Sequence, residues 1–577
     1  MNRIEPRPGE PWPGESWPSA PVAVLGAGPV GQSTALLLAR WGVPTVVLDQ
    51  RPARDAVGSK AICQQRDVLD IWAAVGAGEQ IAAEGVTWTT ARTFHRDAEL
   101  FSYSFAEAGR PAFPPFVNIS QSRTEQILDE RIAAEPLIDL RWGRRVTGIA
   151  QSADGVALRC ADGSQLHASY LVVCCGARDE GLRAQLGVRF DGHSFDDRFL
   201  ICDIRAELPG WATERRFYFD PAWNPGRQVL IHPCPDSTFR IDWQVPAGYD
   251  LDAEAASGAL DARIRAIIGE RAYEIVWSSV YRFHSRCVDR MRVGRVLLAG
   301  DAAHLVSPFG ARGLNSGVAD AENAAWKIAY VGRGWAPEEL LESYHDERHA
   351  AARENLEITT ATMEFLVPPD AERARRRAEI LAGAATDPEL RAQVNSGRLA
   401  EPFWYVDSPL TTADPQRPFA GRPPRGAVPP PAPGTLCPDA PVPPASGTGW
   451  GRRFRELARD GFLLLAADGV DGEAVRAAAA RAAGPTRVLA LPEIDPVGAL
   501  TAALAARPGE VWIIRPDAHI AAVLAAPDSS DITAALDRAV AHTEGEPPWR
   551  TTGDPVRSRR NGTPSTAVPT AGSTTRN

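Results

Sequence analysis

The segment that most restricts the fold of this chain lies near its start, at residues 21–52, and reads PVAVLGAGPVGQSTALLLARWGVPTVVLDQRP. An apolar run leads into a glycine-rich turn, an amphipathic stretch follows, and a second apolar run ends at Asp49. This order predicts a strand, a turn, a helix and a second strand within about 30 residues, which is a compact βαβ unit. The chain is therefore expected to build a Rossmann-like parallel sheet.

The glycines of this turn predict what the unit binds. Gly26, Gly28 and Gly31 match the spacing GxGxxG. The first permits a tight turn, the second lets a pyrophosphate approach the backbone, and the third lets the helix lie against the sheet. Asp49 has the separation expected of a carboxylate that accepts from a ribose hydroxyl. These residues predict a dinucleotide site, but they do not separate NAD from FAD.

A second glycine-rich segment lies far downstream, at residues 297–328, and reads LLAGDAAHLVSPFGARGLNSGVADAENAAWKI. Its apolar run stops at Asp301 and passes into a glycine-rich loop before a helix begins. Ligands bind beyond the carboxyl ends of parallel strands, at the start of the following helix. Two remote loops of this kind favour one long ligand, and FAD is long enough to contact both.

Composition limits the class of protein further. The net charge of -10 argues against a nucleic-acid partner, which needs clustered Lys and Arg. No apolar run reaches the roughly 18 residues of a membrane span, and the proline-rich start is unlike a secretory signal. The eight cysteines contain no CxxC pair and no zinc-like spacing, so no metal site is predicted. The reducing cytoplasm is the expected compartment.

Taken together, the two glycine-rich motifs resemble those of the class A FAD-dependent aromatic hydroxylases of the para-hydroxybenzoate and phenol hydroxylase type. The resemblance spans roughly residues 20–400, while residues 430–545, with RPDAHIA, resemble the thioredoxin-like C-terminal domain of the phenol hydroxylase branch. It implies an α/β fold: a Rossmann-like FAD-binding domain, an inserted antiparallel-sheet substrate domain, and a thioredoxin-like α/β domain. Short alternating runs rich in aromatic residues, such as RRFYFD and FRIDWQV, also predict the antiparallel sheet.

The expected domain boundaries follow from this division and from changes in composition. They are a disordered tail at 1–20, the FAD-binding domain with C-terminal helices at 21–190 and 285–400, the substrate-binding sheet domain at 191–284, a Pro/Gly-rich linker over the surface at 401–450, the thioredoxin-like domain at 451–543, and a disordered tail at 544–577. The C-terminal domain lacks CxxC, so thiol–disulfide chemistry is not expected there. A structural or oligomerisation role is expected instead, and with it a homodimer.

The resemblance also implies cofactor residues. Asp301 would accept from the ribityl chain of FAD, and Pro308 with the backbone of residues 310–315 would lie beside the isoalloxazine ring. A helix N-terminus there favours the anionic reduced flavin. Lys60 stands near the pyrophosphate position, and Gln121 matches a glutamine that approaches the flavin chain. The full expected set is Gly26, Gly28, Gly31, Asp49, Lys60, Gln121, Asp301, Pro308, Gly313, Leu314 and Asn315.

The implied reaction is hydroxylation of a phenolic or polycyclic aromatic substrate, with NADPH or NADH as electron donor and O₂ as oxidant, through a flavin C4a-hydroperoxide. Because the cofactor carries the chemistry, no catalytic side chain is predicted from a motif. Candidates for contact with a phenol lie in the aromatic-rich region: Tyr218, His232, Arg240, Asp242 and Trp243. Strand residues alternate between two faces, and the sequence does not assign these five to either.

Two points stay open. An FAD-dependent reductase or dehydrogenase without oxygen insertion would need the same motifs, whereas the WxWxIP segment of flavin-dependent halogenases is absent. In CCGARDEGLRAQLG, Cys175 stands where the hydroxylases usually have the aspartate of an Asp-Gly pair that touches both FAD and the nicotinamide. A thiol does not accept hydrogen bonds as a carboxylate does, so we predict slow or selective reduction by NAD(P)H.

Overall fold

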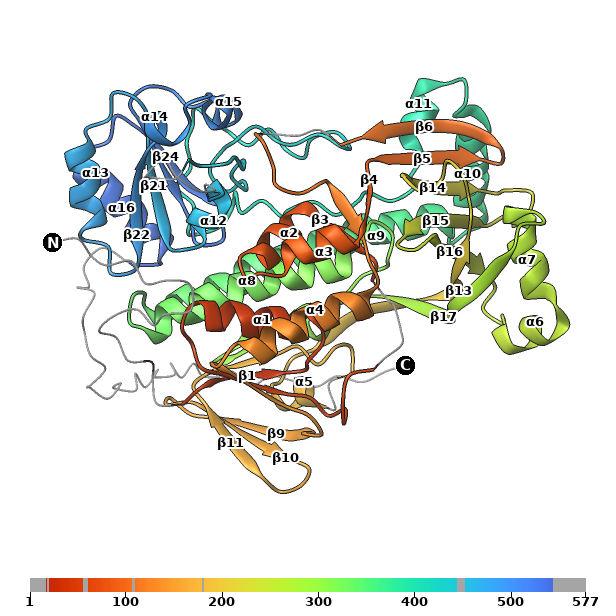
Figure 1. Cartoon of the computed structure of the whole chain (residues 1–577), viewed down its shortest axis with the longest axis horizontal. Coiled ribbons are helices and arrows are strands. Elements are labelled where there is room, and N and C mark those ends of the chain that lie inside the picture. The colour runs from red at the N-terminus through yellow and green to blue at the C-terminus, as the bar shows by residue number, and fades with distance from the viewer. Residues whose placement is uncertain are drawn as a thin grey trace, which may run out of the picture.

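The computed structural model describes residues 17, 20–55, 61–105, 109–178, 181–443 and 452–542 (Figure 1). Within these ranges, no helix is both long and apolar enough to cross a bilayer.

A six-stranded sheet forms the base of the FAD-binding part, in the order β18-β19-β12-β1-β2-β8. Its strands are β1 (Val22–Leu25), β2 (Thr45–Leu48), β8 (Ile138–Arg141), β12 (Leu171–Val173), β18 (Arg292–Val293) and β19 (Val296–Leu298). All neighbours are parallel except β18 and β19. The central strands are wholly buried, which explains their apolar composition.

Helices and two small sheets complete this part of the molecule. The helices are α1 (Pro29–Arg40), α2 (Arg66–Ala73), α3 (Gly78–Glu84), α4 (Gln121–Ala134), α5 (Leu182–Gln185) and α8 (Arg312–Gly332). Figure 1 shows α1 beside both α4 and α8, above β1. The strands β9 (Val146–Gln151), β10 (Val156–Cys160) and β11 (Gln165–Ala168) form one three-stranded sheet, and β3 (Cys63–Gln65), β4 (Val86–Trp88) and β7 (Phe116–Asn118) form another.

An eight-stranded sheet, in the order β20-β17-β13-β16-β15-β14-β5-β6, forms the substrate part. Its strands are β5 (Thr90–His95), β6 (Ala98–Ser104), β13 (Phe190–Ala206), β14 (Glu214–Phe219), β15 (Gln228–Cys234), β16 (Thr238–Val245), β17 (Tyr273–Val288) and β20 (His304–Leu305). All pairs are antiparallel except β14 with β5. The sheet is therefore wider than residues 191–284, because β5 and β6 from the first part of the chain extend it.

Helices cover both faces of this sheet. The helices α6 (Leu251–Ser257) and α7 (Ala259–Ile268) pack on one face. On the other face, α9 (Glu342–Leu366), α10 (Ala371–Gly383) and α11 (Pro388–Gln393) pack through a cluster that includes Phe199, Phe217 and Phe309. The second face also carries the cavity described below.

The C-terminal domain has a four-stranded sheet in the order β22-β21-β23-β24. Its elements are α12 (Phe454–Ala458), β21 (Phe462–Ala466), α13 (Gly472–Ala479), β22 (Thr486–Ala490), α14 (Leu491–Ile494), α15 (Ala499–Leu504), β23 (Glu510–Ile514), β24 (Ile520–Ala525) and α16 (Ser529–Ala539). Only β23 runs antiparallel to its neighbours, which is the arrangement of thioredoxin-like domains. The three-part α/β fold class expected from the sequence is confirmed.

The segment before this domain differs from the expected surface linker. Its described part, residues 401–443, has little regular structure, yet Tyr405, Leu410 and Cys437 are buried. Leu410 packs in the core cluster of the FAD-binding part, Cys437 packs in the core of the C-terminal domain, and the Tyr405 hydroxyl accepts from Asn323 of α8 and Arg348 of α9. The segment therefore packs against the rest of the protein and does not run over its surface as a linker.

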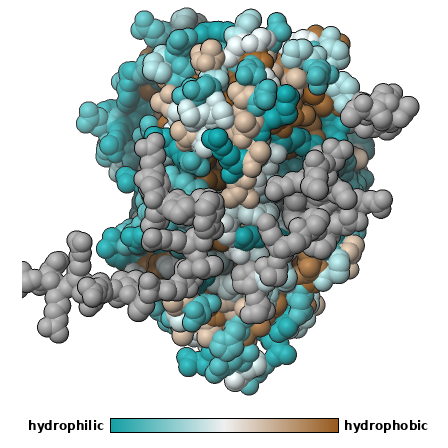
Figure 2. Space-filling view, turned by 90° about the vertical axis from the view of Figure 1, so that its left-hand side faces the viewer, coloured by the Kyte–Doolittle hydropathy of each residue, from teal (hydrophilic) through white to brown (hydrophobic). Residues whose placement is uncertain are grey.

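The outer surface of the C-terminal domain mixes hydrophilic residues with scattered apolar ones (Figure 2). Among the described residues of this domain, Val497 is the one large hydrophobic side chain that is mostly exposed. A broad apolar patch is the usual mark of a stable dimer interface. The homodimer remains a prediction without support from this surface.

Candidate cofactor and substrate site

One cavity of about 800 Å³ joins the two glycine-rich segments to the eight-stranded sheet. Its wall includes Gly28 from the first turn, Asp301 and Pro308 from the segment after β19, and Leu230 from β15. This volume lies in the range usual for cofactor and ligand sites. Segments almost 300 residues apart in sequence thus line one continuous space, as a single long ligand requires.

Each glycine of the first turn meets a different structural requirement. Gly26 has φ +105°, and a Cβ there would lie 2.5 Å from the carbonyl oxygen of Cys174. A Cβ on Gly31 would lie 1.8 Å from the carbonyl oxygen of Gly26, so this glycine lets α1 approach the turn. Gly28 meets nothing within 4 Å and lines the cavity. The backbone at Gly28 is therefore bare where a pyrophosphate would approach, which fits a dinucleotide.

Asp49 lies at the end of β2 and lines the cavity, but its carboxylate already has several donors. It accepts from the Ala27 N–H at 2.8 Å and from the backbone and guanidinium of Arg51 at 2.9–3.0 Å. Burial acts to raise the pKa of Asp49, but these hydrogen bonds outweigh it and hold the pKa below its usual value. A ribose hydroxyl would have to displace one bond from Arg51, whose guanidinium also pairs with Asp55 at 3.1 Å.

The second glycine-rich segment folds as a tight turn followed by the long helix α8. Asp301 and Pro308 are exposed on the cavity wall. Gly310 has φ +104°, and a Cβ there would lie 2.2 Å from the carbonyl oxygen of Arg398. Gly313 and Leu314 lie in the first turn of α8 and line the cavity. The positive end of this helix therefore faces the cavity, where it favours electron-rich ligand groups.

Asn315, Gln121 and Lys60 complete the set of expected cofactor residues. The Asn315 side chain accepts from the Gln65 N–H at 2.9 Å and donates to the carbonyl of Cys63 at 3.0 Å, so it joins β3 to α8. Gln121 lines the cavity, where its carbonyl accepts from the Ala61 N–H at 3.1 Å. Lys60 lies outside the described residues.

Strand alternation divides the five candidate substrate contacts into two groups. His232, Arg240 and Asp242 line the cavity. Trp243 and Tyr218 lie on the opposite face, where they pack in the cluster beneath α6 and α7. The register places His232 opposite Arg240, with Asp242 two residues further along the same face of β16. We therefore retain only His232, Arg240 and Asp242 as candidate contacts.

The sequence argument missed Arg215, which also lines the cavity from β14. The available signal was its place in RRFYFD: in a strand, Arg215 must share a face with Phe217, and Arg216 must point to the other face. The apolar part of the cavity wall includes Phe199, Ile201, Leu230, Phe283 and Phe309.

Burial shifts the titration of this polar group. Arg240 is neutralised by Asp203, to which it donates twice at 2.7 and 2.9 Å. Burial raises the pKa of Asp242 to about 7, although Arg240 opposes this. Burial also lowers the pKa of His232 well below its usual value, with Arg215 and Arg240 acting in the same direction. At neutral pH, the His232 ring is therefore neutral and Asp242 is partly protonated.

The loop that carries Cys175 also forms part of the cavity wall. Arg183 anchors it: the guanidinium donates to the carbonyl of Ala177 at 2.8 Å and to that of Ala302 at 3.0 Å. The loop is thereby tied to the turn that carries Asp301.

We predict that Cys175→Asp accelerates reduction of bound FAD by NAD(P)H by about ten-fold, the worth of one charge-assisted hydrogen bond to the nicotinamide. Anaerobic stopped-flow reduction of the FAD-loaded protein measures this rate. FAD content should be unchanged, because other residues line the rest of the cavity. Fast reduction of the unaltered protein, with no gain in the variant, would contradict the prediction.

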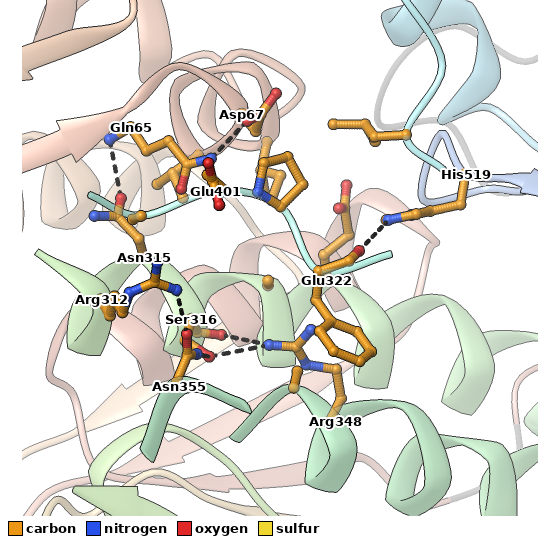
Figure 3. Close-up of a pocket in the computed structure, with 18 of the residues that line it drawn as sticks. Gln65, Asp67, Arg312, Asn315, Ser316, Glu322, Arg348, Asn355, Glu401 and His519 are labelled. Atoms are coloured by element: carbon orange, nitrogen blue, oxygen red, sulfur yellow. Dashed lines mark hydrogen bonds between the residues drawn. The ribbon is translucent and has the colours of Figure 1, made fainter. Parts of the chain in front are cut away.

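A second, smaller pocket of about 60 Å³ lies behind the first turn of α8 (Figure 3). Arg312 borders both cavities and donates to Asn355 at 2.7 Å. Arg348 donates to the Ser316 hydroxyl at 3.1 Å and to Asp320 at 2.6 Å. Hydrogen-bonded charged side chains thus line this pocket.

Asp320 connects this pocket to the cofactor turn. Its carboxylate accepts from the Gly300 N–H at 2.9 Å and lies 2.7 Å from Nε2 of His304. His304 is buried, and the contact of its Nε2 with Asp320 is a hydrogen bond. Asp320, which is also paired with Arg348 at 2.6 Å, therefore holds the turn Gly300–Ala302 that contains Asp301.

Comparison with known proteins gives consistent matches. The model of a family described as FAD binding domain matches residues 19–359. A 3-(3-hydroxy-phenyl)propionate/3-hydroxycinnamic acid hydroxylase of Mycobacterium sp. (strain JLS) is 29% identical over 377 residues, which cover 65% of this chain and 65% of that relative. A rifampicin monooxygenase of Streptomyces venezuelae is 34% identical over 368 residues, covering 62% of this chain and 74% of the relative. The chain thus spans about two thirds of the first relative's length.

Two solved structures share the fold. The flavin-dependent monooxygenase PieE, in complex with FAD and substrate, is 23% identical with a TM-score of 0.77, covering 91% of this chain and 100% of the other. Aklavinone-11 hydroxylase, with FAD and aklavinone, is 24% identical with a TM-score of 0.72, covering 91% and 100%. At these identities the likeness concerns the fold alone.

Proposed function

This chain belongs to the FAD-binding family of class A flavin-dependent monooxygenases and aromatic hydroxylases, and from that premise we propose that it hydroxylates a phenolic or polycyclic aromatic substrate with O₂ and NADPH or NADH. One observation carries the proposal. The cavity that begins at the glycine turn continues, without interruption, to an aromatic wall with a few buried polar groups. A site of this composition suits a flat, largely apolar ring that bears polar substituents.

The residues present fit FAD. The bare backbone at Gly28 and the carboxylate of Asp49 would hold its adenosine diphosphate half. Gln121 and Asp301 would accept or donate along the flavin chain, and the first turn of α8 would lie beside the ring system. When bound, FAD supplies the electron transfer and the oxygen chemistry.

The chain's own residues would position the substrate and exclude water. Phe199, Phe283 and Phe309 form a packed aromatic wall, with ring centroids 4.6–6.1 Å apart. Such rings favour stacking with an aromatic substrate. At the polar end, ionised Asp242 can accept a hydrogen bond from a phenol. In its neutral form, Asp242 can donate a hydrogen bond to the ionised phenol oxygen. This arrangement would favour partial ionisation of a bound phenol.

The alternative, an FAD-dependent reductase without oxygen insertion, needs the same cofactor residues. The two are separated by supplying NADPH or NADH, O₂ and a panel of phenols and polycyclic aromatics to the FAD-loaded protein. A monooxygenase gives a product heavier by one oxygen atom, with O₂ and NAD(P)H consumed together. NAD(P)H oxidation with a reduced organic product and no oxygen incorporation would favour the reductase.

A further inference from the structure

Arg215 lies on the cavity face of β14, and no carboxylate of the described residues forms a salt bridge with its guanidinium. It is 2% exposed, and its Nε and Nη2 atoms have no hydrogen-bond partner among the described residues. The neighbouring Arg216 differs: it pairs with Glu214 at 3.0 Å and lies over the ring of Trp211 on the other face of the sheet. Two adjacent arginines thus have opposite roles, one paired at the surface and one buried beside the cavity.

The groups around Arg215 do not supply its counter-charge. Arg240 already holds Asp203 in a bidentate pair. The pKa values of Cys63 and Tyr103 are raised by burial, so both side chains stay neutral. Asp242 is the one remaining acid of the group, and its Oδ1 has no hydrogen-bond partner among the described residues. A buried cation without a partner is costly, and such a cost is ordinarily offset by a ligand of opposite charge.

We propose that Arg215 binds an oxyanion attached to the aromatic ring of the substrate, either a carboxylate or the ionised oxygen of an acidic phenol or enol. The inference rests on the proposed function and names the substrate class within it: acidic aromatics in preference to neutral ones. The guanidinium presents a planar pair of donors, which matches the geometry of such oxygens. Nδ1 of His232, also without a partner among the described residues, lies on the same wall.

Binding of such an anion should depend on Asp242. The charged and titratable groups facing this carboxyl are Arg240, Asp203, Arg215, His232 and the Cys234 thiol, whose pKa burial raises to about 12. Above its pKa of about 7, ionised Asp242 would repel the anion, and below it the neutral carboxyl would donate to it. Affinity for a fully ionised ligand should therefore rise as the pH falls through about 7, and Asp242→Asn should remove this dependence.

The test measures equilibrium binding to the oxidised, FAD-loaded protein through the change in flavin absorbance, so no turnover is needed. A hydroxynaphthoate and its uncharged carboxamide form one pair of probes. A hydroxynaphthoquinone, whose enol is ionised at neutral pH, and the parent naphthoquinone form the second pair. We expect the charged member of at least one pair to bind about ten-fold or more tightly than its neutral partner. The pair that shows the preference identifies the source of the oxyanion.

Arg215→Met should abolish this preference and Arg216→Met should keep it. Because Nε and Nη2 of Arg215 have no hydrogen-bond partner in the described part of the chain, Arg215→Met should also leave the thermal midpoint of the protein unchanged or higher. Equal binding of charged and neutral probes to the unaltered protein, a preference that survives Arg215→Met, or a clear loss of stability in that variant would each overturn the proposal. Probe binding without oxygenation of any ligand would instead count against the proposed function and leave the anion site standing.

Discussion

Replacement of Asp301 by alanine is expected to remove most of the bound FAD while the protein stays folded. Asp301 lies in the turn after β19, and its side chain is exposed on the cavity wall. In the proposed function its carboxylate accepts from hydroxyls of the flavin chain. Loss of a charged acceptor of this kind costs about 3 kcal/mol, which corresponds to about 100-fold weaker binding.

FAD content after gel filtration and the dissociation constant from a fluorescence titration measure this effect. Asp301→Asn should be intermediate, since an amide keeps one acceptor oxygen. Asp346→Ala, at an exposed position of α9 outside the cavity, is the matched control and should bind FAD normally. Full flavin occupancy of Asp301→Ala with unchanged affinity would show that the carboxylate does not hold FAD.

The cofactor part of the cavity was predictable because its requirements are local. Gly26, Gly28 and Gly31 satisfy turn geometry and close packing within six residues, so their spacing alone predicts the dinucleotide-binding turn. Asp301 could be singled out because a charge that ends a buried strand has few structural reasons to be there. Asn315 was less predictable, since its partners Cys63 and Gln65 lie about 250 residues away in sequence.

The residues that face the substrate could not be predicted from single strands, because the pairing of neighbouring strands decides which side chains share a face. His232, Arg240 and Asp242 share a face because the register of β15 and β16 places them together. The same strands present Trp243 to the opposite face, and no local feature distinguishes the two faces when both are buried. Arg215 was predictable only relative to Arg216, and only after the strand's inner face had been identified.

In the segment before the C-terminal domain, composition predicts the irregular backbone but not the burial of its side chains. The Pro/Gly-rich composition of residues 401–450 favours an extended chain, and the described part is indeed irregular. Composition does not reveal that Tyr405 lies over Arg515, with the guanidinium carbon 5.0 Å from the ring centroid. Burial of such a segment depends on its partners, which are remote in sequence.

Substitution of Arg515 by methionine is expected to destabilise the whole protein and not only its C-terminal domain. Arg515 is fully buried, and it pairs with Glu347 of α9 at 2.5 and 2.9 Å and with Asp517 at 2.6 Å. Lys327 of α8 shares Glu347, at 2.6 Å. Removal of one member of a buried ion group typically costs about 3–5 kcal/mol, because the remaining charges lose compensation. Thermal and urea unfolding of the FAD-loaded protein measure the loss.

Arg373→Met is the control, because Arg373 and Asp370 form an exposed pair at 3.8 Å, of a kind worth at most about 1 kcal/mol. A double-mutant cycle of Arg515→Met with Glu347→Gln should give less than the sum of the single effects, since the two changes remove the same interaction.

The effect should extend to the cofactor turn, because the ion group continues toward it. Asn323 donates to Glu347 and to the Tyr405 hydroxyl, and Arg348 joins that hydroxyl to Asp320. Asp320 in turn accepts from the Gly300 N–H, next to Asp301. If this chain of contacts positions the turn, Arg515→Met weakens FAD binding even at temperatures where the protein remains folded. Normal FAD affinity together with a stability like that of Arg373→Met would mean that the C-terminal domain is separable, as composition alone suggests. A combined loss of stability and FAD affinity would mean that the domain is a structural part of the flavin site.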